Sequence, residues 1–263
     1  MPRSKRFFGN WKMNGSFTQA DTFFSELFEL APNFNLTGTD LIGIAPAACY
    51  LDYVNVKITS GSINTLKLGA QDGSKVGDAA GAFTGQLSML MYADCGASYV
   101  IIGQNEVRVF LGFTSEDCNY RVHRALESGL KILYCVGENL EQYDAGESVT
   151  VITQQLNEGL YNLTAEQVAN SVMIVYEPVW AMGTGKTCDA NTTEERCRSI
   201  RSVVAQLYDQ KTSDNIYILY GGSVKASNAA ELANLPNVDG FLIGGASLQP
   251  DQFLTIIENA TIH

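Results

Sequence analysis

The sequence predicts a closed (β/α)8 barrel, an α/β fold, that forms a single domain over residues 1–263. Three observations support this fold. The length of 263 residues suits one α/β barrel, which has about 250 residues. Short apolar runs recur at intervals of about 30 residues, as parallel strands joined by helices do. Amphipathic stretches fill the intervals, and no linker or low-complexity segment divides the chain.

The apolar runs have the pattern of strands that are covered on both faces. Most are continuous rather than alternating and are rich in Ile, Val and Tyr, as is typical of a parallel sheet. The expected strands are Phe7–Trp11, Leu41–Ala45, Leu66–Ala70, Tyr99–Gly103, Lys131–Val136, Val172–Tyr176, Ile216–Tyr220 and Gly240–Ile243.

The segments between these runs predict helices. Phe17–Leu30 places six apolar residues on one helical face: Phe17, Ala20, Phe23, Phe24, Leu27 and Phe28. Capping boxes are expected at three helix starts: Ser16 with Gln19, Thr164 with Gln167, and Thr192 with Glu195. Strands alternating with helices favour a barrel with right-handed crossovers, and a doubly wound open sheet is the alternative. In a barrel, the active site lies at the carboxyl ends of the strands.

Composition and charge exclude several classes of partner. Apolar residues make up 46% of the chain and charged residues 17%, which argues against disorder. The net charge of -11 makes nucleic acid and anionic membranes poor partners. The sequence shows neither a secretory signal nor an apolar run of membrane-spanning length, so we expect a cytoplasmic protein. The six cysteines lack CxxC spacing and are expected to be reduced and mostly buried.

Two charged residues stand where expected strands end. Lys12 follows the first strand, where a lysine is most often simply solvated. Glu177 follows the sixth and stands directly before Pro178-Val179-Trp180. Burial raises the pKa of a glutamate toward neutrality, which suits proton abstraction, although a structural glutamate is the alternative. The stiff Pro and Trp followed by Gly183-Thr184-Gly185 are typical of a lid with a rigid hinge.

Two glycine-rich turns follow the last two expected strands. They are Gly221-Gly222-Ser223 and Gly244-Gly245. Glycine lets backbone N–H groups approach phosphate oxygens, and barrels of this class often bind phosphate at this place. Either turn alone is a weak signal, but together they predict a phosphate site.

The motifs together resemble the triosephosphate isomerase family. In the family's order they are NWKMN, GAFTGQ, CVGENLEQ, YEPVWAMGTGK, YGGSV and GFLIGGASL, from residue 10 to residue 248. The resemblance implies a TIM barrel without cofactor or metal, acting on a triose phosphate substrate. It also implies a proton shift that interconverts dihydroxyacetone phosphate and glyceraldehyde 3-phosphate through an enediolate. Enzymes of this family adjust the pKa values of their acid and base groups for this reaction.

The resemblance also implies roles for individual residues. Glu177 would be the base, Lys12 would supply positive charge, and Asn10 would orient the substrate and Lys12. The phosphate would be held by Gly183, Ser223, Gly244 and Gly245. The lid would comprise Pro178, Val179, Trp180, Ala181, Met182, Gly183, Thr184, Gly185 and Lys186. Tyr220 and Ser223 would hold the closed lid, Cys135 would be buried, and Trp180 would reach Glu141 in one lid state.

The segment after the fourth strand departs from the family. The family has Gly-His-Ser-Glu-Arg-Arg, whereas this chain has Gly103-Gln104-Asn105-Glu106-Val107-Arg108. Gln104 replaces the electrophilic histidine. The two histidines present, His123 in an expected outer helix and the terminal His263, stand far from this motif. A glutamine amide is a neutral hydrogen-bond donor but cannot relay protons. We therefore expect a slowed isomerase, with a non-catalytic triose-phosphate-binding homologue as the alternative.

The loop Asp72–Gln86 predicts how the chain assembles. It is slightly longer than the family's usual form and carries an apolar residue beside two small ones: Phe83, Thr84 and Gly85. In the family this loop inserts into a partner subunit, with Thr84 near the partner's Asn10. The resemblance therefore implies a homodimer, and a monomer is the alternative.

Overall fold

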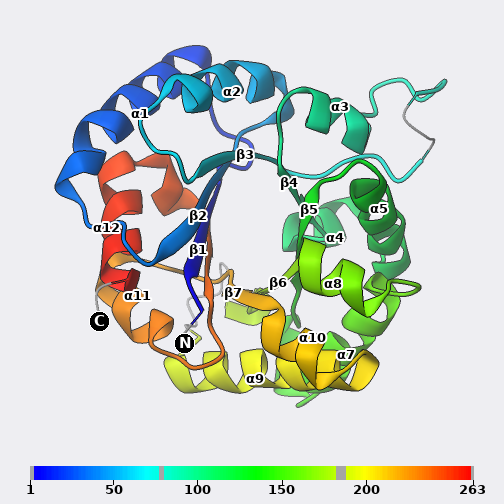
Figure 1. Ribbon diagram of the computed structural model, residues 1–263. Helices are drawn as coiled ribbons and strands as arrows, with labels where there is room; N and C mark the ends of the chain where they lie inside the picture. Colours follow the sequence, from blue (N-terminus) through cyan, green and yellow to red (C-terminus); the bar gives the residue numbers. More distant parts are fainter. Residues whose placement is uncertain (1–2, 77–79, 182–187, 262–263) are drawn as a thin grey trace.

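The computed structural model describes residues 3–76, 80–181 and 188–261, and it shows a closed barrel of parallel strands surrounded by helices (Figure 1). The strands pair in chain order from β1 to β8, and β8 closes the barrel against β1. This arrangement confirms the (β/α)8 TIM barrel and excludes the doubly wound open sheet, in which no such closing pair forms.

The observed strands lie where the apolar runs predict them, with shifts of one or two residues at some ends. They are β1 Lys5–Asn10, β2 Thr39–Ala45, β3 Leu66–Ala70, β4 Tyr99–Ile102, β5 Lys131–Val136, β6 Val172–Tyr176, β7 Tyr217–Tyr220 and β8 Gly240–Ile243. The register is parallel throughout. For example, Phe7 lies opposite Ile42, and Tyr134 lies opposite Ile174.

Helices cover the outside of the barrel in the order of the chain. The α-helices are α1 Phe17–Leu30, α2 Leu51–Ser60, α3 Met89–Asp94, α4 Asn105–Leu111, α5 Ser115–Glu127, α6 Leu140–Asp144, α7 Ser148–Gly159, α8 Ala165–Ser171, α9 Ala190–Leu207, α10 Gln210–Asn215, α11 Ala226–Ala233 and α12 Pro250–Thr261. The 3-10 helices are η1 Ala31–Asn33, η2 Ala48–Tyr50, η3 Val179–Ala181 and η4 Gly245–Leu248. No helix among these described segments is both long and apolar enough to cross a membrane.

Helix α1 has the predicted bounds, but its buried face is narrower than expected. Ala20, Phe23, Phe24 and Leu27 are buried. Phe17, in contrast, is 54% exposed and packs its ring edge-on against Tyr50 and Tyr53 rather than against the barrel. Phe17 is the first residue of the helix, and the buried face begins one turn later at Ala20.

One of the three expected capping boxes is confirmed in full, that of Thr164 with Gln167. At Ser16 only half of the box forms: Ser16 Oγ accepts from Gln19 N and caps α1. The box expected from Thr192 and Glu195 is wrong. Helix α9 begins earlier, because the carboxylate of Asp189 accepts from Thr192 N at 2.7 Å and places Thr192 inside the first turn.

The apolar core has two parts. One lies inside the barrel and includes Phe8, Leu133 and Leu219, and the other lies between the strands and the helices. Alternate residues of each strand face alternate sides, which explains why the strands read as continuous apolar runs. All six cysteines are free; Cys118, Cys135 and Cys197 are buried, whereas Cys49 is exposed. The buried position predicted for Cys135 is confirmed, but only half of the cysteines are fully buried.

Candidate active site

The chain turns sharply where β1 ends, and this turn fixes two of the predicted site residues. Asn10 is the last residue of β1 and is buried. Lys12 has a φ of 52°, a left-handed conformation that few residues other than glycine adopt. The carboxamide of Asn10 holds this turn, because its Oδ1 accepts from Lys12 N at 2.8 Å. Asn10 thus fixes the backbone of Lys12 through this hydrogen bond.

Gln104 lies beside Asn10 at the carboxyl end of β4. It is 8% exposed and directly precedes α4. Asn10 Nδ2 donates to Gln104 Oε1 at 2.5 Å. Since the carbonyl end of the Gln104 amide is occupied in this way, its NH2 end is the one left to donate elsewhere in the site.

Glu106 is a site residue that the sequence reasoning did not single out. Its carboxylate forms an ion pair with the Lys12 ammonium. Both side chains are about one-third exposed, at 34% and 35%, so they stand at the mouth of the site rather than in its interior. Glu106 follows Gln104 by two residues in the sequence, but only the fold brings it to Lys12.

Glu177 occupies the carboxyl end of β6 and is 2% exposed. Asn105 N donates to its Oε2 at 2.9 Å, while its Oε1 has no hydrogen-bond partner among the described residues. The pKa of Glu177 is raised to about 7, mainly by burial and to a smaller extent by the nearby Glu106 carboxylate. The hydrogen bond from Asn105, the Lys12 charge and the Gln104 side chain act in the opposite direction. A carboxyl group poised near neutrality is suited to take up and return a proton.

Two glycines make room for Glu177. A Cβ atom at Gly137 would lie 1.8 Å from the carbonyl oxygen of Glu177, and one at Gly221 would lie 3.1 Å from its Cγ. Any larger residue would therefore displace the base. The sequence reasoning assigned Gly221 to a phosphate turn and overlooked Gly137, because neither close approach can be seen without the neighbouring strands.

The turn after β8 lies next to Lys12. A Cβ atom at Gly244 would be 3.6 Å from Lys12 Cε, whereas one at Gly245 would meet nothing within 4 Å. The space above Gly245 is thus open, on the same side of the barrel as the lysine charge. Gly245 begins the short helix η4, and Ser223 is exposed after β7. Gly183, the remaining phosphate residue expected, lies outside the described residues.

The first part of the expected lid packs against the β5–α6 segment. Pro178 and Trp180 are buried, and the Trp180 ring stacks on Tyr143 with centroids 4.0 Å apart. Trp180 N donates to the carbonyl oxygen of Glu138. Glu138 thus contacts the backbone of Trp180, and the contact between Trp180 and Glu141 in one lid state stays a prediction. Met182, Thr184, Gly185 and Lys186 lie outside the described residues.

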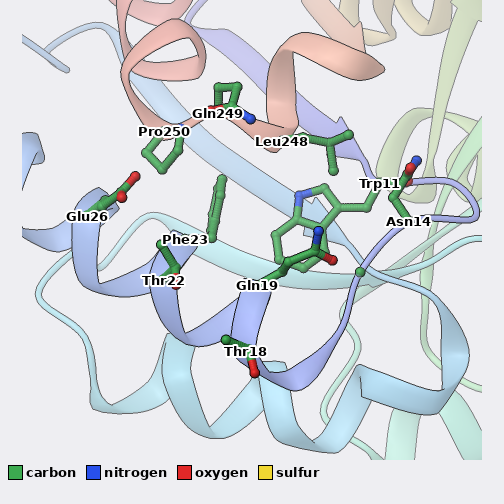
Figure 2. Close-up of a pocket in the computed structure, with 11 residues that line it drawn as sticks. Trp11, Asn14, Thr18, Gln19, Thr22, Phe23, Glu26, Leu248, Gln249 and Pro250 are labelled. Atoms are coloured by element: carbon green, nitrogen blue, oxygen red, sulfur yellow. The ribbon is translucent and has the colours of Figure 1, made fainter.

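A separate pocket of about 320 Å³ lies behind the turn after β1. Figure 2 shows that its lining comes from this turn, from α1 and from the segment that runs from the end of η4 to the start of α12, including Trp11, Phe23 and Leu248. None of the predicted site residues lines it. Its wall helps to fix the site, because Trp11 Nε1 donates to the carbonyl oxygen of Ser247 and ties the end of β1 to η4.

The fold and this geometry define a class of protein: a (β/α)8-barrel protein with a buried glutamate, a lysine and an open glycine turn at the carboxyl ends of its strands. Comparison with known proteins gives the family. The family model for triosephosphate isomerase matches residues 5–260, and the chain belongs to that family. Curated relatives named triosephosphate isomerase occur in Taenia solium and Lactiplantibacillus plantarum, with 42% and 39% identity, each over 95% of both chains. Another, in Streptococcus pyogenes, is 39% identical over 98% of this chain and 99% of its own.

Proposed function

We propose that this protein interconverts dihydroxyacetone phosphate and glyceraldehyde 3-phosphate, with a reaction slowed by Gln104. Its relatives bear the name of the enzyme for this reaction, and the sequence similarity covers nearly their whole length. The observation that carries the proposal is Glu177, a buried carboxyl group with a pKa of about 7 and one oxygen free of hydrogen bonds to the described residues. A protein that only binds phosphate has no use for such a base, so this feature favours an enzyme over a non-catalytic homologue.

The chemistry follows from the positions of three side chains. Glu177 removes a proton from the carbon next to the carbonyl group, and the electron pair moves onto the carbonyl oxygen to form an enediolate. The Lys12 ammonium stabilises that negative charge, and the Gln104 NH2 group donates a hydrogen bond to the oxygen. Glu177 then returns a proton to the adjacent carbon. Since Gln104 cannot give up and recover a proton, Glu177 also carries the proton between the two oxygens.

The phosphate group of the substrate binds above Gly244 and Gly245, with Ser223 and Gly183 as further contacts. The open space over Gly245 and the nearness of Gly244 to Lys12 support this placement. Closure of the lid, Pro178–Lys186, over the bound substrate excludes water from the enediolate, which otherwise eliminates phosphate. Tyr220 and Ser223 hold the closed lid.

A coupled isomerase assay on the purified protein tests this function. We expect measurable turnover, and we expect Glu177→Asp to reduce kcat by roughly two to three decades because the shorter side chain retracts the base. Turnover that is absent from the parent protein, while phosphoglycolate still binds, would instead identify a non-catalytic triose-phosphate-binding homologue.

The protein is proposed to act as a cytoplasmic homodimer. Phe83, Thr84 and Gly85 are exposed on the loop after β3, which extends away from the barrel body (Figure 1). Further large apolar side chains are exposed after β1, β3 and β4; β3 and β4 are neighbours in the barrel, and only β2 separates β3 from β1. They are Met13, Leu87, Leu90, Met91, Val109, Phe110 and Leu111, and Met13 is 97% exposed. So many exposed apolar side chains after three strands in one part of the barrel favour a protein interface.

A further inference from the structure

The end of the barrel opposite the active site contains a second cavity. It has a volume of about 380 Å³, large enough for a small organic anion, and lies at the amino ends of the strands. Its cationic lining residues are Arg6 on β1, Lys67 on β3 and Lys131 on β5. The Asn10 end of β1 is four residues from Arg6, so about 13 Å of strand separates this cavity from the candidate active site.

The three cations belong to one layer of the barrel. Each cation stands near the start of its strand, two residues before an inward-facing position; these positions are Phe8, Gly69 and Leu133. Side chains two residues apart on a strand lie on the same face, so the three cations also face the inside of the barrel. Alternate strands contribute the side chains of one barrel layer, and Tyr217 on β7 supplies the fourth. The layer is therefore a ring of Arg, Lys, Lys and Tyr around the opening.

Two of these cations are held in place by the protein. The Arg6 guanidinium pairs with Asp40 at 2.9 Å and lies 3.5 Å from the centre of the Tyr217 ring. Lys131 Nζ donates to the carbonyl oxygen of Asn170 at 2.8 Å. An ammonium group has three N–H donors, so two of those on Lys131 remain for a ligand.

Lys67 has no such partner. Its side chain makes no hydrogen bond or ion pair with any residue that the structure describes, and it is exposed at the opening. The charged residues of the lining are three cations and one carboxylate, which gives a formal charge of +2. The chain as a whole has a net charge of -11, so this opening is a local reversal of the surface field.

We propose that the amino-terminal mouth of the barrel binds a small dianion of phosphate type, either free phosphate or the phosphate group of a small ester. An anion there offsets the mutual repulsion of the three cations and takes up the donors of Lys67 and Lys131. The Lys67 and Lys131 ammonium groups line this opening from β3 and β5, and the Arg6 guanidinium on β1 adds its charge beside them. This site is independent of the proposed isomerase reaction.

The test must separate this site from the phosphate site at the other end. Gly245→Val serves as the background, since its side chain fills open space where the substrate phosphate is placed without meeting protein atoms. In that background, we compare the parent with Lys67→Gln and with Lys57→Gln. Lys57 is a matched control, a lysine paired with Asp21 on the outer surface of α2.

Inorganic phosphate is titrated by calorimetry at low ionic strength, and thermal unfolding is followed in parallel. We expect Gly245→Val to keep one phosphate site, Lys67→Gln to weaken it at least tenfold, and Lys57→Gln to leave it unchanged. Titration with glycerol 3-phosphate then distinguishes the two forms of the ligand. If glycerol 3-phosphate binds more tightly than inorganic phosphate, the ligand is a phosphate ester; if it binds more weakly, the ligand is the free ion. Equal phosphate affinity in the Lys67 and Lys57 variants, or no binding in either, would overturn the proposal.

Discussion

Asn10 Nδ2 donates a hydrogen bond to Gln104 Oε1 over 2.5 Å, and this contact sets the direction of the Gln104 amide. It turns the acceptor end of Gln104 toward β1 and leaves the NH2 end as the donor of the site. Glutamine can thus retain the hydrogen-bonding part of the histidine's role while losing proton relay. The following predictions rest on this arrangement and on the ion pair beside it.

Substitutions at Gln104 separate its role as a hydrogen-bond donor from the proton relay that it lacks. Gln104→His should raise kcat by roughly one to three decades, the range that one oxyanion-hole donor commands, and Gln104→Ala should lower it further. KM should change little, because phosphate contacts dominate binding. Steady-state assays of the three proteins check this. A histidine variant with unchanged kcat, whose ring is correctly placed in a crystal structure, would contradict the donor-only role.

The direction of the Gln104 amide can be tested at Asn10. In Asn10→Asp, the side chain still accepts from Lys12 N but no longer donates to Gln104 Oε1. Gln104 should then reverse its amide and present its oxygen to the substrate oxygen, which should reduce kcat by roughly tenfold or more. The double variant Asn10→Asp with Gln104→Ala serves as the control. If Asn10→Asp reduces kcat by the same factor in the Gln104→Ala background as in the parent, the reduction does not depend on Gln104.

The raised pKa of Glu177 predicts the pH dependence of both activity and stability. The carboxylate is the active form, so kcat/KM should fall as the pH drops through about 7. Folding favours the protonated form, because the pKa rises from 4.5 to about 7. This contribution to stability is complete below pH 4.5 and is lost as the pH rises through 7.

Glu177→Gln should therefore be more stable than the parent at pH 8, by on the order of 2–4 kcal/mol, and nearly equal to it at pH 4.5. Urea unfolding at the two pH values measures the difference. If the free energies of unfolding of the variant and the parent differ by the same amount at both pH values, the effect comes from packing and not from the titration of Glu177.

Glu106 should shift the pH profile without being the base. Its charge raises the pKa of Glu177, so Glu106→Gln should move the acidic limb of kcat/KM to lower pH. The variant also frees the Lys12 ammonium from its ion pair, so KM should change as well. The pH profile is the decisive measurement, since loss of a merely structural contact would lower activity at all pH values alike.

The exposed apolar residues predict a dissociable dimer. Phe110 is 78% exposed, so Phe110→Asp should leave the barrel folded while weakening association by at least tenfold. Sedimentation at micromolar concentration measures this. Tyr161→Asp is the matched control, because Tyr161 is 64% exposed but follows α7 on another side of the barrel. A parent chain that sediments as a fully active monomer would rule out the dimer.

The sequence by itself determined the barrel and most of the candidate site. Strands buried on both sides read as continuous apolar runs, and polar residues at their carboxyl ends meet at one end of a parallel barrel. This is why Lys12 and Glu177 could be selected from the strand ends, whereas Asn10 and Gln104 were selected through the resemblance to the family. Local signals were less secure, as the start of α9 shows, because two polar residues three positions apart, Asp189 and Thr192, both suit the cap of one helix.

Only the tertiary structure decided how these residues act on one another. The pairing of Lys12 with Glu106, the orientation of Gln104 by Asn10, and the space that Gly137 leaves for Glu177 all join residues far apart in the chain. The same is true of the cationic ring of Arg6, Lys67 and Lys131, whose members begin three different strands. Distances across a barrel depend on closure and register, and pKa shifts depend on burial, neither of which a linear pattern contains.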